Sequence, residues 1–286
     1  MEVLSSNSAV ALLKKATRQL AGLEQPALEA EVLLAYVLGS TRSRLLSLAE
    51  RTLSDAQLTQ FNGLLERRLQ GEPVAYLTGR REFWSLDLQV TADVLIPRPE
   101  TELLVELALE RIPENESWRI ADLGTGSGAI ALAIAKERPA CRVIATDISP
   151  AALQVALGNA ERLGIRNVEF RLGDWCSALH GERFDMIVSN PPYVASADPH
   201  LDALGYEPQL ALVAGEDGLQ SLRDIAAQAR DYFQVGGGWL MLEHGYDQAP
   251  ELLQMLPGLG YERVEDFADL AGIPRVTVAL WRGSDE

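Results

Sequence analysis

The chain has 286 residues, of which 47% are apolar and 23% are charged, so it is long enough to form two globular domains. No apolar run approaches the length of a membrane span, and the N-terminus lacks a signal-peptide pattern, so we expect a cytoplasmic protein. Two cysteines, Cys141 and Cys176, and three histidines offer neither a disulfide framework nor a zinc cluster. We therefore expect no metal site and two buried thiols.

The formal net charge is -16 and is unevenly distributed along the chain. Residues 1–75 hold as many acidic as basic side chains, so the whole acidic excess lies in residues 76–286. A protein that binds nucleic acid needs cationic side chains to neutralise phosphates. The acidic part of the chain therefore argues against DNA or RNA as a direct partner.

Residues 8–71 have apolar side chains at helical spacing. Ser54 followed by Gln57 forms a capping box that begins one of these helices. We predict that residues 1–75 form a small helical bundle. No catalytic constellation lies in it, so its expected role is to select a macromolecular substrate for the domain that follows.

Residues 76–97 contain an alternating stretch, 83–90, that predicts a β-hairpin linking the two domains. Residues 97–102 then begin a helix, because a proline and acidic side chains are favourable in a first helical turn. Helix initiation explains these residues without any function. Their closeness to the second domain, residues 98–286, leaves open a role over a bound cofactor.

A glycine loop follows the first strand of this second domain. Residues 119–123 predict a buried strand and residues 129–136 a helix. The loop between them consists of Gly124, Thr125, Gly126, Ser127 and Gly128. Glycines let the backbone turn tightly and approach a ligand at a helix N-terminus, so the loop predicts a cofactor site.

The next two predicted strands each end at polar side chains. Residues 142–146 lead to Asp147, whose carboxylate is suited to accept hydrogen bonds from two ribose hydroxyls. Residues 168–172 lead to Asp174 and Trp175, a carboxylate for an adenine amino group and an indole for the ring. Ligands of open α/β sheets bind outside the carboxyl ends of the strands, so these residues predict an adenosine site.

The loop also admits a second interpretation. Gly124, Gly126 and Ala129 fit the dinucleotide pattern G-x-G-x-x-A, with an acidic residue after the second strand. A single match of this kind is weak evidence for a dehydrogenase. The motif after the fourth strand separates the two interpretations.

Residues 186–188 predict a further buried strand, which ends by delivering Asn190, Pro191, Pro192 and Tyr193. Two prolines cannot extend a central strand, so the backbone leaves the sheet as a stiff turn. The first proline also holds Asn190 extended, which fixes the Asn amide, two carbonyls and the Tyr ring together. This quartet is foreign to dehydrogenases. It resembles the substrate motif of S-adenosylmethionine-dependent methyltransferases that modify planar nitrogens, either an amide or the exocyclic amine of a base.

The remaining residues complete the predicted sheet. Residues 195–220 form loops over the substrate, in which His200 is expected to be solvent-exposed rather than a catalytic base. Strands are predicted over 239–243, 261–266 and 275–281, the last two as a hairpin that reverses strand direction at the sheet edge. We predict an α/β fold: a seven-stranded Rossmann-like class I methyltransferase domain preceded by the helical bundle and the β-hairpin linker.

Taken together, the motifs resemble those of the N5-glutamine methyltransferases of peptide chain release factors, the HemK/PrmC family. The resemblance also includes residues 78–84, 96–102 and 242–245, so it covers nearly the whole chain. It implies S-adenosyl-L-methionine bound by residues 124–128, Asp147, Trp175 and Asn190. It also implies that Asn190, Pro191, Pro192 and Tyr193 hold a substrate glutamine, that of the Gly-Gly-Gln loop of class I release factors.

Within the quartet we expect Asn190, Pro191 and Tyr193 to be the catalytic residues. Three alternatives stay open. A glutamine methyltransferase acting on a ribosomal protein would share every catalytic residue. An adenine-N6 DNA methyltransferase would use the same quartet, but the acidic charge argues against it. A non-enzymatic S-adenosylmethionine-binding partner of translation factors would not need the intact quartet.

Overall fold

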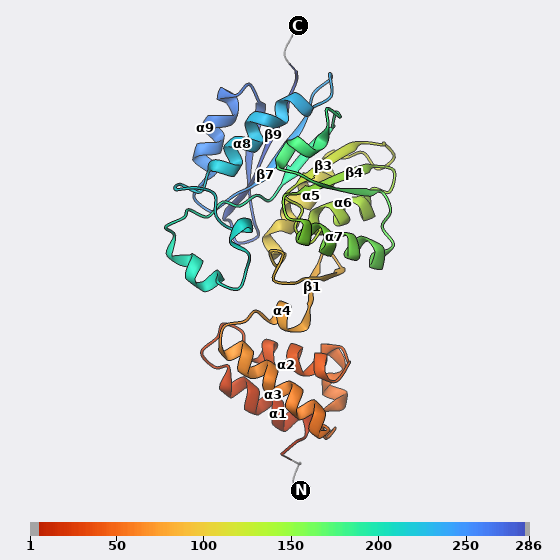
Figure 1. The fold of residues 1–286 in the computed structure, drawn as a ribbon, viewed down its shortest axis with the longest axis vertical. Coiled ribbons are helices and arrows are strands. Elements are labelled where there is room, and N and C mark those ends of the chain that lie inside the picture. The colour runs from red at the N-terminus through yellow and green to blue at the C-terminus, as the bar shows by residue number, and fades with distance from the viewer. Residues whose placement is uncertain (1–5, 284–286) are drawn as a thin grey trace. The chain divides into compact units, whose positions relative to one another are not determined.

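The structure, a computed structural model, describes residues 6–283. The chain divides into two compact units between Arg80 and Arg81 (Figure 1). The first unit is helical, and the second contains the β-strands of the main sheet.

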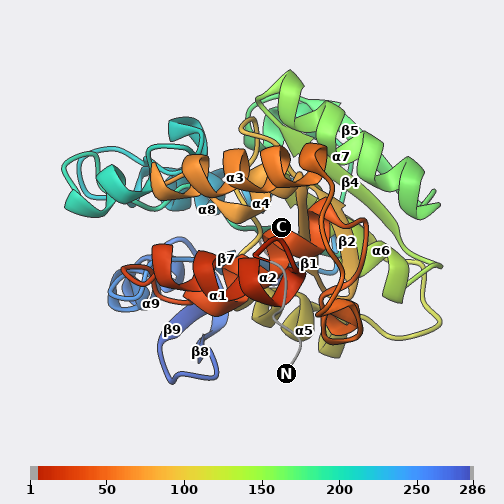
Figure 2. The ribbon, with the colours of Figure 1, turned by 90° about the horizontal axis from the view of Figure 1, so that it is seen from below.

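The first unit is built from a few short helices around an apolar core. They are α1 (Ala9–Gln19), α2 (Pro26–Val37), the 3-10 helix η1 (Arg42–Leu48), α3 (Asp55–Leu69) and α4 (Val74–Thr78). Helix α2 packs against both α1 and α3 (Figure 2). The predicted capping box is confirmed, because Ser54 Oγ accepts from the Gln57 N–H and Gln57 Oε1 accepts from the Ser54 N–H.

The boundary between the units falls at the start of a short hairpin, β1 (Arg80–Phe83) and β2 (Leu86–Gln89), and the second unit continues as alternating strands and helices. Its other strands are β3 (Arg119–Leu123), β4 (Arg142–Asp147), β5 (Val168–Leu172), β6 (Met186–Ser189), β7 (Gly238–Glu243), β8 (Glu262–Ala268) and β9 (Pro274–Trp281). Its α-helices are α5 (Glu102–Arg111), α6 (Ala129–Glu137), α7 (Pro150–Leu163), α8 (Gln220–Ala229) and α9 (Ala249–Gly258). Its 3-10 helices are η2 (Pro99–Thr101), η3 (Trp175–Leu179), η4 (Pro199–Leu204), η5 (Gln209–Ala211) and η6 (Arg230–Tyr232).

The main sheet has seven strands in the order β5-β4-β3-β6-β7-β9-β8. The first five strands in this order pair in parallel, whereas β9 is antiparallel to both of its neighbours. The predicted seven-stranded α/β fold and its final hairpin are confirmed. Within the hairpin only β9 is reversed, because the connection through α9 keeps β8 parallel to β7 and leaves one position between them for β9.

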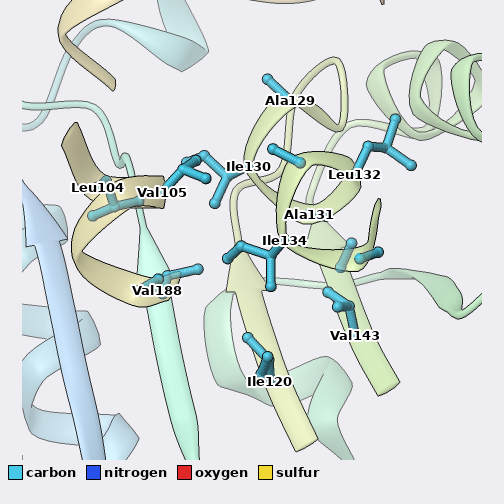
Figure 3. Close-up of a cluster of buried hydrophobic side chains, with 14 of the residues drawn as sticks. Leu104, Val105, Ile120, Ala129, Ile130, Ala131, Leu132, Ile134, Val143 and Val188 are labelled. Atoms are coloured by element: carbon cyan, nitrogen blue, oxygen red, sulfur yellow. The ribbon is translucent and has the colours of Figure 1, made fainter. Parts of the chain in front are cut away.

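Alternate residues of the central strands point to opposite faces of the sheet. Ile120, Val143 and Val188 pack on one face, where Figure 3 shows them near Val105 of α5 and Ile134 of α6. Their neighbours along the strands belong to the core on the other face, with α8 and α9: Ala121, Ile144 and Ile187. Helices cover both faces, which explains why the central strands are continuous apolar runs.

Both cysteines are buried and free, as predicted. Over residues 6–283, no helix combines the length and the apolar composition that crossing a membrane requires. The carboxyl ends of the parallel strands lie at one edge of the sheet, where ligands of α/β proteins bind.

Replacing Ile187 by alanine is expected to lower the free energy of unfolding of the second unit by about 3 kcal/mol, because it leaves a cavity at a fully buried position. All five tryptophans lie in residues 81–283, so their fluorescence during urea unfolding reports on this unit alone. The control is Val235→Ala, whose side chain is 94% exposed and which should change stability by less than about 0.5 kcal/mol. Equal losses in both variants would contradict the assigned core.

Candidate active site

The glycine loop connects β3 to α6 in a backbone conformation that requires glycine. Gly124, Gly126 and Gly128 have φ angles of 73°, 55° and 85°, in the left-handed region that other residues rarely adopt. The N–H groups of Gly124 and Thr125 both donate to the Thr146 carbonyl, at 2.9 Å each. The loop is thereby closed against the end of β4.

A pocket lies at the carboxyl ends of the parallel strands. Its lining includes most of the residues selected from the sequence: Gly124, Thr125, Gly126, Ser127, Asp147, Asp174, Trp175, Asn190 and Pro192. Gly128, Pro191 and Tyr193 are not part of the lining. A Cβ atom on Gly128 would come within 3.2 Å of Ala156 in α7, so this glycine allows α6 and α7 to approach closely.

Asp147 is the last residue of β4, and each of its carboxylate oxygens accepts a hydrogen bond from a backbone N–H group. Its Oδ2 accepts from the Gly126 N–H and its Oδ1 from the Ser149 N–H, both at 2.9 Å. Burial raises the pKa of this carboxyl, and the backbone hydrogen bonds oppose that effect. Each oxygen keeps a second lone pair, so the carboxylate retains acceptors for hydroxyl groups of a ligand.

Trp175 forms a wall of the pocket beside the glycine loop. A Cβ atom on Gly124 would lie 3.2 Å from the Trp175 ring, so only glycine lets the indole pack against the loop. Trp175 itself has a φ of 42°, a strained conformation of the kind found at ligand sites. Asp174 precedes it at the start of η3 and is exposed.

Asp122 is a functional candidate that sequence reasoning missed. It lies in β3, and its Oδ2 accepts from Thr125 Oγ1 at 2.6 Å and from the Ala131 N–H at 3.2 Å. Its Oδ1 has no hydrogen-bond partner among the described residues. Complete burial raises the pKa of this carboxyl to about 7. The signal in the sequence was an acidic residue inside an apolar strand directly before the loop.

Asn190 presents an amide whose two ends have different surroundings. Its Nδ2 donates to Thr101 Oγ1 at 3.1 Å, whereas its Oδ1 is buried without a hydrogen-bond partner among residues 6–283. The Tyr193 carbonyl accepts from Gln248 Nε2 at 3.0 Å, and Gln248 Oε1 accepts from the Gly245 N–H at 2.9 Å. The quartet is therefore held in place by α5's leading segment and by the loop before α9.

Thr101, which binds this asparagine, and Glu243, at the end of β7, are both buried polar residues. Glu243 Oε2 has no hydrogen-bond partner among the described residues. Burial raises the pKa of Glu243 to about 7. The sequence places Thr101 in a helix start, with a role over a cofactor left open, and Glu243 only at the end of a predicted strand.

The loops after β6 contribute to the pocket rim. Glu207 is buried, and its carboxylate accepts from the Ile96 N–H at 3.1 Å and from Arg98 Nη2 at 2.5 Å. Its neighbours Pro208 and Leu210 line the pocket. The His200 side chain is 79% exposed and pairs with Asp198. It is solvent-exposed, as predicted, and is not part of the pocket lining.

Among residues 6–283 no group of three or more His, Cys, Asp or Glu side chains is arranged to hold a metal ion. The polar atoms of the pocket are instead backbone N–H groups, hydroxyls, three carboxylates (Asp93, Asp147 and Asp174) and the Asn190 amide. This set of atoms suits an organic ligand with hydroxyl and amino groups, and a planar N–H donor beside it.

Comparisons with known proteins show the family to which the chain is similar. Two family models match the chain, the PrmC N-terminal domain over residues 11–79 and the methyltransferase small domain over residues 101–205. The release factor glutamine methyltransferase of Coxiella burnetii (strain RSA 493 / Nine Mile phase I) is 50% identical over 254 residues, covering 89% of this chain and 91% of that protein. The enzyme of that name from Escherichia coli (strain K12) is 48% identical over 271 residues, covering 94% and 97%.

A solved structure supports the fold. The crystal structure of a methyltransferase from Pyrococcus furiosus is 21% identical and superposes with a TM-score of 0.53, covering 78% of this chain and 99% of that chain. The predicted methyltransferase fold is confirmed.

Asp122→Asn is expected to change how stability depends on pH. The folded pKa of Asp122 is about 7 and its ordinary value is 3.8, so the folded state holds a proton that the unfolded state has lost between these pH values. Wild-type stability should therefore fall relative to the variant as pH rises from 4 to 7, by about 2 to 4 kcal/mol. The measurement is urea unfolding at several pH values.

The matched control is Asp202→Asn, at an exposed position. Its stability should run parallel to that of the wild type over the whole range. If Asp122→Asn also runs parallel to the wild type, the buried carboxyl is not protonated at neutral pH and the assignment is wrong.

Proposed function

Because the chain belongs to the family of release factor glutamine methyltransferases, we propose that it methylates a glutamine side chain of class I peptide chain release factors. The acceptor is the amide nitrogen, N5, of the glutamine in the Gly-Gly-Gln motif, and the methyl donor is S-adenosyl-L-methionine. This modification modulates translation termination, and the substrate implies action in the cytoplasm. The observation that carries the proposal is the Oδ1 of Asn190 in the pocket lining, which is buried and has no hydrogen-bond partner among the described residues.

The pocket residues fit S-adenosyl-L-methionine by the chemistry of their donors and acceptors. Gly124 and Gly126 let the ligand approach the backbone, and the free lone pairs of Asp147 accept from ribose hydroxyls. Asp174 and Trp175 supply an acceptor and a flat surface for the adenine. When bound, the cofactor supplies an electrophilic methyl group on a positively charged sulfur.

The chain must orient an amide nitrogen, which is a weak nucleophile because its lone pair is delocalised into the carbonyl. Asn190 Oδ1 and the Pro191 carbonyl each accept one N–H of the substrate NH2 group. Both acceptors favour the positive charge that develops on the nitrogen, and together they direct its lone pair toward the cofactor pocket. Tyr193 packs against the flat amide, and its backbone is held by Gln248.

No general base is required in this mechanism. Methylation of the nitrogen gives a protonated amide, which is a strong acid and releases its proton to water. The absence of His200 from the site is consistent with this, since its side chain is 79% exposed and pairs with Asp198. The chain therefore acts by orientation and by electrostatic stabilisation.

The test is methyl transfer from labelled S-adenosylmethionine to purified release factor and to its Gly-Gly-Gln→Gly-Gly-Ala variant, beside ribosomal proteins and duplex DNA. Label on the wild-type release factor alone supports the proposal and identifies the acceptor residue. Label only on a ribosomal protein or only on DNA would overturn the substrate assignment in favour of the corresponding alternative. No transfer to any of them would favour a non-enzymatic role.

Asn190→Ala is expected to lower kcat by about 100-fold, because it removes an acceptor that is strengthened in the transition state. Single-turnover methylation and calorimetric titration with S-adenosylmethionine measure the two effects separately. Cofactor affinity should change much less than turnover. A variant that keeps its turnover within a factor of a few would contradict the role of the amide oxygen.

Asp147→Asn is expected to lower cofactor affinity and to leave turnover nearly unchanged. It replaces a carboxylate by an amide with one acceptor oxygen, so affinity for S-adenosylmethionine should fall about tenfold, while kcat at saturating cofactor changes little. Titration calorimetry of the variant and of Asp202→Asn gives the comparison. Unchanged cofactor affinity would remove Asp147 from the proposed cofactor site.

A further inference from the structure

Gln248 connects three loops at the carboxyl ends of the strands through one side-chain amide. Its Oε1 accepts from the Gly245 N–H at 2.9 Å. Its Nε2 donates to the Tyr193 carbonyl at 3.0 Å and to the Gly218 carbonyl at 3.2 Å. The side chain is buried and comes directly before α9. The quartet, the segment before α8 and the loop after β7 therefore meet at one side chain.

The partners of this amide determine which way it is turned. An N–H group can only donate and a carbonyl oxygen can only accept, so Oε1 must face Gly245 and Nε2 must face the two carbonyls. Each of the two protons on Nε2 has its own acceptor. Among residues 6–283, Gln248 makes no hydrogen bond or ion pair with a charged side chain. The position therefore requires a neutral side chain with one acceptor and a double donor.

The segment of residues 195–217, which we call the flap, forms part of the pocket wall. It supplies several residues to the lining: Pro208, Leu210, Ala211 and Val213. Its two ends are paired through the backbone, because the Val194 N–H donates to the Leu212 carbonyl and the Ala214 N–H donates to the Val194 carbonyl, both at 2.9 Å. The end of the quartet and the flap therefore form one hydrogen-bonded unit.

Gly218 shows how closely the two ends of the flap approach each other. Its φ is 74°, and a Cβ atom at this position would clash with the Tyr193 carbonyl oxygen and lie 2.9 Å from Gln248 Nε2. Only glycine leaves room for the Gln248 amide to reach both carbonyls. Tyr193 precedes the flap and Gly218 follows it, so this amide holds the two ends together.

We propose that Gln248 is a positioning residue that fixes the quartet relative to the flap. It acts through the Tyr193 backbone and not by contact with the reacting atoms. The proposed acceptors for the substrate amide, Asn190 Oδ1 and the Pro191 carbonyl, come shortly before Tyr193 in the stiff quartet. A shift of the Tyr193 backbone therefore displaces these acceptors and the ring that packs on the amide. The effect on turnover rests on the proposed function.

The first test compares the full chain with Gln248→Glu, which keeps the shape and one acceptor oxygen but loses both donated hydrogen bonds. At about pH 9 the new side chain is a carboxylate that faces two carbonyl oxygens. The kcat for release factor should then fall about tenfold. Affinity for S-adenosylmethionine should stay within about threefold, because the backbone hydrogen bonds that hold Asp147 to Gly126 and Ser149 are left intact.

Acid should restore this variant, because a protonated carboxyl regains a donor for one of the two carbonyls. Burial favours the protonated form, so the ratio of variant to wild-type kcat should rise at least about threefold between about pH 9 and about pH 6. Gln248→Met has no donor at any pH, and its kcat ratio should stay low. Both proteins share the titratable residues next to the three loops, so their titration cancels in the ratio: Asp217, His244 and Asp247.

Asn167→Asp is the matched control for an amide that donates to several backbone carbonyls. Asn167 comes directly before β5, at the amino end of that strand and outside the pocket lining. Its Nδ2 donates to three carbonyls, those of Ala135, Arg138 and Cys141. The variant should keep kcat within about twofold of wild type even if its stability is lower. Equal losses of kcat in Asn167→Asp and Gln248→Glu would show a general structural effect and overturn the proposal.

Hydrogen exchange tests the closure of the flap without a substrate. The Val194 and Ala214 N–H groups pair the ends of the flap, so in Gln248→Met they should exchange at least about tenfold faster than in the wild type. Wild-type exchange or wild-type kcat in Gln248→Met, or no acid recovery in Gln248→Glu, would overturn the proposal. Absence of methyl transfer by the wild-type protein would instead refute the proposed function, and the exchange rates would still test the role of Gln248.

Discussion

The site depends on one hydrogen bond, from Asn190 Nδ2 to Thr101 Oγ1. It occupies the donor end of the amide and leaves the acceptor end buried, with no partner in the part of the chain that the structure describes. An unpaired buried acceptor is costly in the free protein, and a substrate that supplies an N–H removes that cost. The prolines of the quartet and the Gln248 contacts serve the same purpose, because they keep the surrounding backbone from relaxing toward the unpaired oxygen.

The sheet topology places this bond beside the cofactor pocket. Strands β3, β4, β6 and β7 run in parallel, so the polar residues at or near their carboxyl ends gather at one edge: Asp122, Asp147, Asn190 and Glu243. Helices on both faces bury that edge, which is why burial is the largest cause of the raised pKa values of its carboxyl groups. The same burial that builds the core thus sets the charge states of the site.

Much of this arrangement follows from local sequence patterns. Apolar runs ended by glycine or by polar residues predicted the strands, and the glycine loop and the quartet predicted the pocket, because turn chemistry and strand order act over short distances. The Thr101–Asn190 bond joins residues 89 positions apart, and a threonine after prolines is already explained by helix initiation. Glu243 likewise has the features of an ordinary strand end. Hydrogen bonds between distant segments leave no periodic signal, so only the fold could reveal them.

The most direct measurement of the central claim, that Asn190 presents an acceptor, uses two release factors of nearly identical shape. Both Gly-Gly-Gln and Gly-Gly-Glu release factors would be tested as ligands in the presence of the demethylated cofactor product. A carboxylate facing Asn190 Oδ1 has no N–H to donate, so the account predicts that the Glu form binds at least about tenfold more weakly. Equal or tighter binding of the Glu form would show that Asn190 presents its NH2 group, and would contradict the account.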